Sequence, residues 1–303
     1  MTGRWVRRGL ILEPPVHLPW VSSHAMVPTV RVHGDERVEL LFSPRDEQGR
    51  SRIARAWFDD LDAALEIEPE PVLDVGRLGA FDDSGVNASC LVAEEGRWLL
   101  YYIGWARAVS VRFVTAIGCA VSHDDGRTFE RVSEGPVIGR DLDNPYFSTS
   151  PWVLREDGCW RMWYASGVRW EAAGGRPEPR YNIRYAESLD GRRWERGPVC
   201  IDFDRPDEHA IARPAVVRDG DLYRMWFSHR GRSYRIGYAE SPDGVTWDRS
   251  VPGPTLAGGE GGAWESEMVE YPFVFDFRGA RHLFYNGDGF GRTGIGHARF
   301  EDG

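Results

Sequence analysis

Ile183-Arg-Tyr-Ala-Glu-Ser188 is one of five related hexapeptides in the chain. The other four read Ile53-Ala-Arg-Ala-Trp-Phe58, Ile117-Gly-Cys-Ala-Val-Ser122, Ile236-Gly-Tyr-Ala-Glu-Ser241 and Ile295-Gly-His-Ala-Arg-Phe300. Each copy begins with isoleucine and has alanine at its fourth position, and successive copies start 64, 66, 53 and 59 residues apart. Self-similarity of this kind is the signature of a repeat architecture, so we expect five equivalent structural units.

Two further β segments precede each hexapeptide. The nearer segment is rich in aromatic residues and occupies 40–43, 99–102, 162–165, 225–228 and 283–286 in the five repeats. The farther segment occupies 28–33, 89–92, 151–154, 214–217 and 272–275. Short turns such as Glu156-Asp157-Gly158 join the two segments, which is typical of a β-hairpin.

Three or four strands per repeat, with almost no helical periodicity, predict an all-β fold. A β-sandwich would not repeat its residues in this way, and an all-β solenoid would have a period roughly half as long or less. We therefore expect a single five-bladed β-propeller with a central funnel. Its blades should span approximately 20–65, 80–130, 143–197, 206–250 and 263–303.

Three hexapeptides run into a turn that ends on an aromatic residue. These turns read Ser122-His-Asp-Asp-Gly-Arg-Thr-Phe129, Ser188-Leu-Asp-Gly-Arg-Arg-Trp194 and Ser241-Pro-Asp-Gly-Val-Thr-Trp247. They resemble the Asp-box turns of other propellers, although the spacing differs. Because Asp and Gly shape tight turns and an aromatic side chain fills the gap between blades, we expect these turns to be structural.

Composition excludes several classes of partner. The 37 basic and 47 acidic residues give a net charge of −10, which argues against a general nucleic-acid or anionic-membrane binder. The chain contains no lysine, so Schiff-base and P-loop lysines are excluded. Anion binding must therefore depend on arginine, histidine or backbone N–H groups.

Cysteine spacing and hydropathy indicate in which cellular compartment the protein is expected. Cys90, Cys119, Cys159 and Cys200 form no CxxC pair, so we expect reduced, buried thiols rather than a zinc site or a redox motif. No stretch approaches the length of a membrane span, and the apolar piece 10–12 is too short for the core of a signal sequence. These features favour a cytoplasmic protein; they leave its oligomeric state open.

One face of the disc should carry the functional site. In a propeller the innermost strands begin on one face, and the loops between the second and third strands return to it. The entries to the inner strands supply the acids Asp83, Asp143, Glu208, Glu267 and Glu270, and the polar residues His24, Asn87, Ser150, His209 and Arg213. The second-to-third loops vary in length and, with the strand end before them, supply Trp105, Arg169, Trp170, Tyr181, Arg230, Asn286 and Arg292.

This mixture of residue types indicates a carbohydrate site. Paired carboxylates from different blades can flank one glycosidic bond. Aromatic faces stack on sugar rings, and arginine forks suit a carboxylate or a phosphate. No spacing of potential ligands indicates a metal ion, and no cofactor motif is present.

The fivefold repeat and the polar inner strands resemble the five-bladed propeller enzymes of glycoside hydrolase families 43 and 32 and the mannoside phosphorylases of family 130. Glu270-Tyr-Pro272 is similar to the Glu-Gly-Pro pattern that carries the general acid in family 43. Ser150-Pro-Trp, Arg213-Pro and Tyr285-Asn-Gly-Asp-Gly resemble a bacterial subgroup often found near sugar-biosynthesis genes. There are two departures. Families 43 and 32 have their base in an Asp-Pro motif on the first blade, where this chain has His24 and Pro28. The Glu-Tyr-Pro of this chain also lies on the last repeat rather than the third, which is consistent either with a shifted blade register or with loss of hydrolysis.

The resemblance implies an enzyme that cleaves or transfers a glycosidic bond, on a sugar or sugar phosphate with an anionic group. Glu270 would be the general acid and Asp83 the facing base or nucleophile. Glu267, Glu208 and Asp143 would tune pKa values or hold hydroxyls. The arginine content also fits a phosphorylase, in which Arg213, His209 and Arg230 would bind phosphate. A propeller that binds or converts a sugar without hydrolysing it is the remaining alternative.

Overall fold

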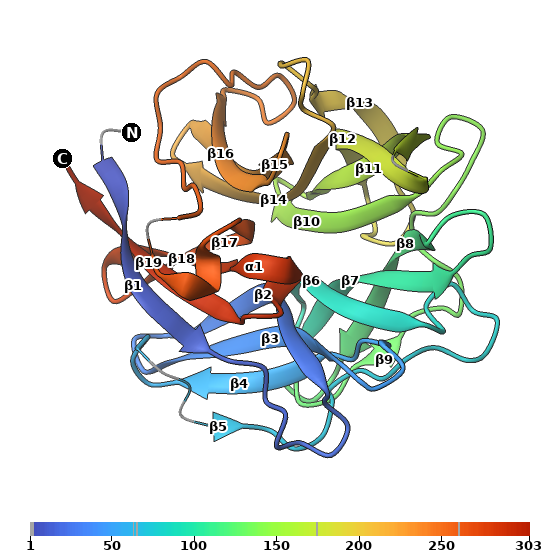
Figure 1. The fold of residues 1–303 in the computed structure, drawn as a ribbon, viewed down its shortest axis with the longest axis horizontal. Helices are drawn as coiled ribbons and strands as arrows, with labels where there is room; N and C mark the ends of the chain where they lie inside the picture. The colour runs from blue at the N-terminus through green and yellow to red at the C-terminus, as the bar shows by residue number, and fades with distance from the viewer. Residues whose placement is uncertain (1–2, 63, 65, 174, 260) are drawn as a thin grey trace.

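The computed structural model describes residues 3–62, 64, 66–173, 175–259 and 261–303, almost all of them in β-strands or turns (Figure 1). The strands form five antiparallel blades around a common axis, which confirms the expected five-bladed propeller. In the described residues, the short helical turn η1 (Ala263–Glu265) precedes the last blade, and α1 (Asp288–Gly291) lies within it, between its second and third strands. No helix in the described part of the chain is long and apolar enough to cross a membrane.

The first four blades follow the chain in order. Blade 1 consists of β2 (Ser23–His33), β3 (Arg37–Arg45), β4 (Ala54–Phe58) and β5 (Glu66–Ile67). Blade 2 consists of β6 (Gly85–Glu94), β7 (Arg97–Arg107), β8 (Phe113–Ser122) and β9 (Glu130–Arg131). Blade 3 consists of β10 (Ser148–Glu156), β11 (Cys159–Ala173), β12 (Arg176–Ser188) and β13 (Glu195–Ile201). Blade 4 consists of β14 (Ala210–Asp219), β15 (Leu222–Arg230) and β16 (Tyr234–Ser241).

Blade 5 combines the two ends of the chain. Its inner three strands are β17 (Glu270–Phe277), β18 (Ala280–Asn286) and β19 (Ile295–Asp302), and its outer strand is β1 (Gly3–Leu12). β1 pairs antiparallel with β19 along its whole length, so the blue and red ends of the ribbon lie together (Figure 1). Closing the ring in this way leaves β19 without a free edge. The sequence repeat did not indicate β1, because this strand lies outside the repeated segments.

A bulge recurs in the inner strands, at the residue that precedes a proline. Val27, Ser150, Arg213 and Tyr271 all have positive φ values between 52° and 54°, and each stands directly before proline. The register of each inner strand shifts at this point. Positive φ is unfavourable for residues with a Cβ, so its repetition shows that the surrounding blade enforces the bulge.

The Asp-containing turns join neighbouring blades. In the turn after β12, the Ser188 hydroxyl accepts a hydrogen bond from the Gly191 N–H at 2.9 Å. The Gly191 carbonyl accepts one from the Tyr101 hydroxyl of blade 2 at 2.7 Å, and the Trp194 ring packs edge-on against Tyr101. These turns therefore fix the packing of one blade on the next.

Candidate functional site

Charged and aromatic side chains gather where the inner strands begin. We define the axial cluster as eight residues of blades 1, 3, 4 and 5 and the α1 segment: His24, Arg45, Tyr181, Arg230, Tyr234, Glu270, Tyr271 and Arg292. Two backbone contacts hold strand ends of this cluster in position. The Val269 N–H donates to the Tyr234 carbonyl at 3.3 Å, and Ser23 pairs with Arg45 in blade 1. The strand ends at this face thus bring together residues far apart in the sequence.

Glu270 is the buried acid of the axial cluster. Its side chain has no exposed surface, and neither carboxyl oxygen has a hydrogen-bond partner among the described residues. Burial raises the pKa of Glu270 well above its usual value, and the charge of Arg230 opposes this rise only in part. An unpartnered buried carboxyl group is costly to the fold. This combination of burial, orphaned oxygens and a raised pKa is typical of a proton donor at a functional site.

Tyrosines surround this carboxyl group. The hydroxyls of Tyr181 and Tyr234 form a hydrogen bond with each other, and the guanidinium of Arg230 lies 5.5 Å from the Tyr234 ring centre. Burial raises the pKa of Tyr181 to about 12. Burial and the adjacent Glu270 carboxyl also raise the pKa of Tyr271. All three phenols are therefore neutral hydrogen-bonding groups near neutral pH.

The blade 1 side of the cluster is cationic. The Nε atom of Arg45 is buried without a partner among the described residues, and Arg292 forms no ion pair with any of them. Burial, followed by the charge of Arg292, lowers the pKa of Arg45. Burial, Arg45 and Arg292 together lower the pKa of His24 to about 4. Arg45 is half-buried and Arg292 is exposed, and neither is paired with a carboxylate among the described residues, so these two neighbouring arginines are suited to bind an anion.

The other four predicted acids do not join Glu270 in the axial cluster. Glu208 is bound by Arg249 through two contacts of 2.8 and 2.9 Å and by His229 at 3.0 Å. Burial alone would raise the pKa of Glu208, but these hydrogen bonds outweigh it and the pKa falls. Asp83 accepts hydrogen bonds from the Gly79 N–H and the Ser84 hydroxyl within its own loop. The remaining two, Asp143 and Glu267, are exposed.

Three of the predicted binding residues have their polar atoms engaged by the scaffold. The Arg213 guanidinium is fully buried and donates to the Ser89 and Pro28 carbonyls. Asn286 is also buried and binds the Val27 N–H and the Ala25 carbonyl, which joins blade 5 to blade 1. The Trp105 indole N–H donates to the Ser51 hydroxyl at 2.9 Å.

The other predicted binding residues lie at or near the same face. Trp170 packs edge-on against Phe113 and Phe147, and Phe147 in turn packs edge-on against Tyr181. Arg169 pairs with Glu171 at 2.7 Å, and His209 is half-buried in front of β14. Asn87 has a buried Oδ1 atom without a partner among the described residues, and Ser150 has a left-handed backbone at the bulge of β10.

Sequence reasoning missed Tyr234 and Tyr271 as site residues. Tyr234 stands two residues before the hexapeptide Ile236–Ser241, as Tyr181 does before the preceding copy, so the repeat itself contained this signal. Tyr271 occupies the central position of Glu270-Tyr-Pro272, where the similar family pattern has glycine. A side chain at this position with positive φ adds a phenol beside the acid.

Within the described ranges, no group of three or more His, Cys, Asp and Glu side chains is arranged to hold a metal ion.

Two mycobacterial proteins are similar to this chain along nearly its whole length. The uncharacterized proteins MT1551 and Rv1502 of Mycobacterium tuberculosis are each 42% identical over 306 residues, which covers 98% of this chain and 99% of the relative. No protein-family model matches the chain.

Three of the solved structures that share the fold of this chain are described as glycoside hydrolases or as members of a phosphorylase family. A glycoside hydrolase superposes with a TM-score of 0.79 at 17% identity and covers 98% of this chain and 92% of its own. A structure from the GH130 family of mannoside phosphorylases, described as containing hydrolases of β-1,2 mannosidic linkages in Candida mannan, has a TM-score of 0.71 at 15% identity, with 100% and 94% covered. A thermostable family-43 glycoside hydrolase gives 0.64 at 15%, with 96% and 91% covered. The TM-scores and coverage show that these proteins share the fold of this chain, and at such low identities they show the fold alone.

Proposed function

This chain belongs to the family of the mycobacterial proteins MT1551 and Rv1502, and we propose that it is a carbohydrate-active enzyme that cleaves or transfers a glycosidic bond. Its substrate would be a sugar that carries an anionic group. The observation that carries the proposal is the Glu270 carboxyl, which is buried at the axial face with both oxygens unpartnered among the described residues and with a raised pKa.

Glu270 would act as the general acid. A carboxyl group with a raised pKa retains its proton near neutral pH and can donate it to the glycosidic oxygen as the bond to the leaving group breaks. The neighbouring Tyr181 and Tyr234 hydroxyls would bind sugar hydroxyls, and the aromatic surface of Trp170 would contact a sugar face. Structural neighbours of this fold act on carbohydrates, which supports the substrate class at the level of fold alone.

Arg45 and Arg292 would hold the anionic group. Neither has a carboxylate partner among the described residues, and each lowers the pKa of His24, so their charges act on one small region. A carboxylate or phosphate bound there would relieve the repulsion between the two guanidinium groups. This arrangement favours an acidic sugar over a neutral one.

Phosphorolysis is a second candidate that one observation favours. Hydrolysis with a paired base needs another carboxylate beside Glu270, and the predicted partner Asp83 has both oxygens engaged within its own loop. Inorganic phosphate can itself attack the anomeric carbon, so a phosphorylase needs one acid and a positively charged site that binds phosphate. The axial cluster contains both.

The test compares Glu270→Gln with Asp83→Asn in the full chain. Aryl glycosides and aryl uronides would be assayed with and without inorganic phosphate, and the binding of each sugar would be measured by calorimetry. We expect Glu270→Gln to preserve binding and to lower turnover at least about a hundredfold. Phosphorolysis is supported if turnover depends on phosphate and Asp83→Asn leaves it intact. Hydrolysis with Asp83 as the base is supported if turnover proceeds without phosphate and Asp83→Asn abolishes it.

Arg45→Gln and Arg292→Gln test the substrate class. Each should raise KM for the acidic sugar about tenfold, with a smaller effect on a neutral analogue, since a hydrogen bond to a charged group is worth roughly 1.5–3 kcal/mol. If no glycoside yields product while Glu270→Gln weakens sugar binding, the protein is a sugar-binding module and the proposed catalysis is wrong.

A further inference from the structure

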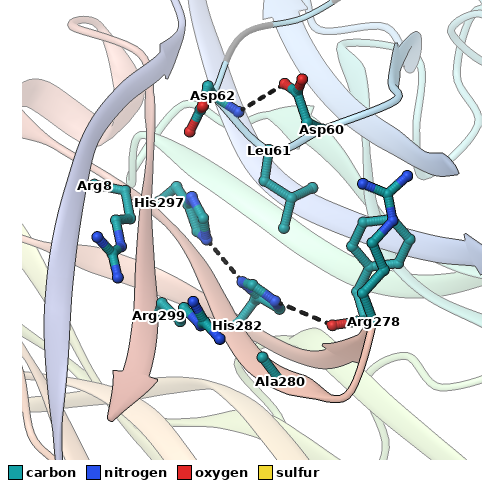
Figure 2. Close-up of a pocket in the computed structure, with 10 residues that line it drawn as sticks. Arg8, Asp60, Leu61, Asp62, Arg278, Ala280, His282, His297 and Arg299 are labelled. Carbon is teal, nitrogen blue, oxygen red and sulfur yellow. Dashed lines mark hydrogen bonds between the residues drawn. The ribbon is translucent and has the colours of Figure 1, made fainter. Parts of the chain in front are cut away.

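A pocket lies at the end of the inner strands opposite the axial cluster. It has a volume of about 330 Å³ and lies between blade 5 and the loop that follows β4 of blade 1 (Figure 2). Phe277, at the end of β17, lines this pocket, whereas Glu270 begins β17 at the axial face. A strand of eight residues separates its two ends by roughly 23 Å, so the pocket and the axial cluster are distinct sites.

Two histidines form the buried wall of the pocket. His282 of β18 and His297 of β19 are both buried, and their rings are joined by a hydrogen bond of 2.9 Å from ring nitrogen to ring nitrogen (Figure 2). The other nitrogen of His282, Nε2, lies 3.3 Å from the Phe277 carbonyl oxygen. The other nitrogen of His297, Nδ1, is buried and has no hydrogen-bond partner among the described residues.

When both histidines are neutral, they have too few N–H groups to give every polar atom of this hydrogen-bonded chain a partner. A neutral histidine has a single N–H, so two neutral rings supply two donors. One donor is needed between the rings and one for the Phe277 carbonyl, which leaves His297 Nδ1 as a bare lone pair. The Leu61 carbonyl also faces His297 and favours a proton on that ring. One additional proton on His297 would satisfy every member of the chain.

Burial, and then nearby positive charges, disfavour that proton. Burial, then His282 and Arg8, lower the pKa of His297 to about 3, and Arg299 adds to the effect. Burial and the same two arginines also lower the pKa of His282, against the Phe277 carbonyl and Asp276. Figure 2 shows Arg8 and Arg299 on one side of the imidazoles, with Arg278 opposite them.

The charges of these arginines are only partly balanced. Arg8 pairs with Glu301 at 2.6 Å, and Arg278 donates to the Asp35 and Glu36 carbonyls. Arg299 has no hydrogen bond or ion pair from its side chain to any described residue. The acidic side chains at the rim, Asp60 and Asp62, are exposed, as are the three arginines, so water screens all of these charges.

We propose that this pocket binds a small oxyanion, either free phosphate or the phosphate group of a larger ligand, together with one proton taken up by the His282–His297 pair. The oxyanion lies against Arg8 and Arg299 and supplies the negative charge that permits His297 to become an imidazolium. His297 then donates through both ring nitrogens, and the orphaned Nδ1 atom gains a partner. Binding of the anion and uptake of the proton strengthen each other by linkage.

Calorimetry on the full chain tests both halves of the proposal. Inorganic phosphate measures affinity, and sulfate measures proton uptake, because sulfate does not titrate near neutral pH. Titrations in buffers of different ionisation enthalpy should show uptake of a fraction of a proton that rises towards one as the pH falls. Arg299→Gln should weaken binding of both anions about tenfold, and His297→Asn should abolish proton uptake.

Matched variants separate this pocket from other basic positions. Arg193→Gln removes the same charge from an exposed arginine of blade 3 and should leave binding unchanged. Arg45→Gln tests the axial cluster, where the proposed function also expects an anion, and should preserve the proton-coupled event. The proposal is overturned if phosphate and sulfate show no saturable binding, if binding proceeds without proton uptake, or if Arg45→Gln abolishes it while Arg299→Gln does not. None of these results depends on whether the protein turns over a glycoside.

Discussion

The guanidinium of Arg213 on β14 donates hydrogen bonds to both the carbonyl and the hydroxyl oxygen of Ser89 on β6, at 2.7 and 2.9 Å. The Ser89 hydroxyl in turn donates to the Pro151 carbonyl of β10 at 2.7 Å. Arg213 also donates to the Pro28 carbonyl of β2 and lies 5.7 Å from the Phe273 ring centre of β17. One arginine and one serine therefore join the inner strands of all five blades.

Replacing Arg213 with methionine should destabilise the propeller by about 2–4 kcal/mol, because several buried acceptors lose a charged donor at once. Methionine fills much of the same volume, so the change reports on the hydrogen bonds rather than on a large cavity. Urea unfolding followed by tryptophan fluorescence measures the difference. Arg193→Met, at an exposed arginine, should stay within about 0.5 kcal/mol of the wild type. Equal stability of the two variants would show that the hydrogen bonds of Arg213 make no net contribution to the stability of the fold.

Glu270→Gln should stabilise the protein while it removes the proposed acid. Because the pKa of Glu270 is raised in the folded state, ionisation of this carboxyl group adds no destabilisation below the ordinary glutamate pKa of about 4.3. As the pH rises above that value, the unfolded chain ionises first and wild-type stability falls by about 1.4 kcal/mol per pH unit until the folded pKa is reached.

The stability gap between Glu270→Gln and wild type should therefore be near zero at acidic pH and widen towards neutral pH. Denaturant unfolding at a series of pH values measures it. Glu267→Gln, at an exposed neighbour, should show no such widening. A constant gap across the series would mean that the Glu270 carboxyl ionises normally in the folded protein.

The repeat and the turns explain how much of this structure the sequence could predict. Ile183–Ser188 and its copies mark the third strand of each blade, because a propeller repeats the same local burial pattern five times. Strand β1 escaped detection, since it closes the ring by pairing with a partner almost the whole chain away. Local pattern cannot reveal such a contact.

The candidate site was predictable in location but not in composition. The bulge before proline decides where Arg213 and Tyr271 point, and positive φ at such residues cannot be read from their identity. Likewise, Glu208 and Glu270 both read as acids at inner-strand entries. Only the fold shows that Arg249 and His229 bind the first and that no described residue binds the second.

The thiols should be unreactive in the native protein. All four cysteines are free, as the sequence predicted, but only Cys90 and Cys119 are buried, whereas Cys159 and Cys200 are half-buried. Burial raises the pKa of Cys90 to about 11 and of Cys119 to about 12. Thiolate is the reactive species, so we expect almost no labelling of these two by a thiol reagent at neutral pH. Mass spectrometry before and after denaturant addition checks this. Rapid labelling of Cys90 without denaturant would show that blades 2 and 3 separate readily in solution.

Trp5 anchors the closing strand, and its removal should open the ring. Its ring packs edge-on against Trp226 of blade 4 and Phe300 of β19, and its indole N–H donates to the Pro254 carbonyl at 2.9 Å. Trp5→Ala should cost about 3–5 kcal/mol, as expected for a buried tryptophan, and should expose the edge of β19 to pairing with other chains. Urea unfolding and light scattering measure the two effects. Arg4→Ala, at an exposed position of the same strand, is the control and should change neither. If Trp5→Ala keeps wild-type stability and stays free of aggregates, β1 contributes little to holding the five blades closed.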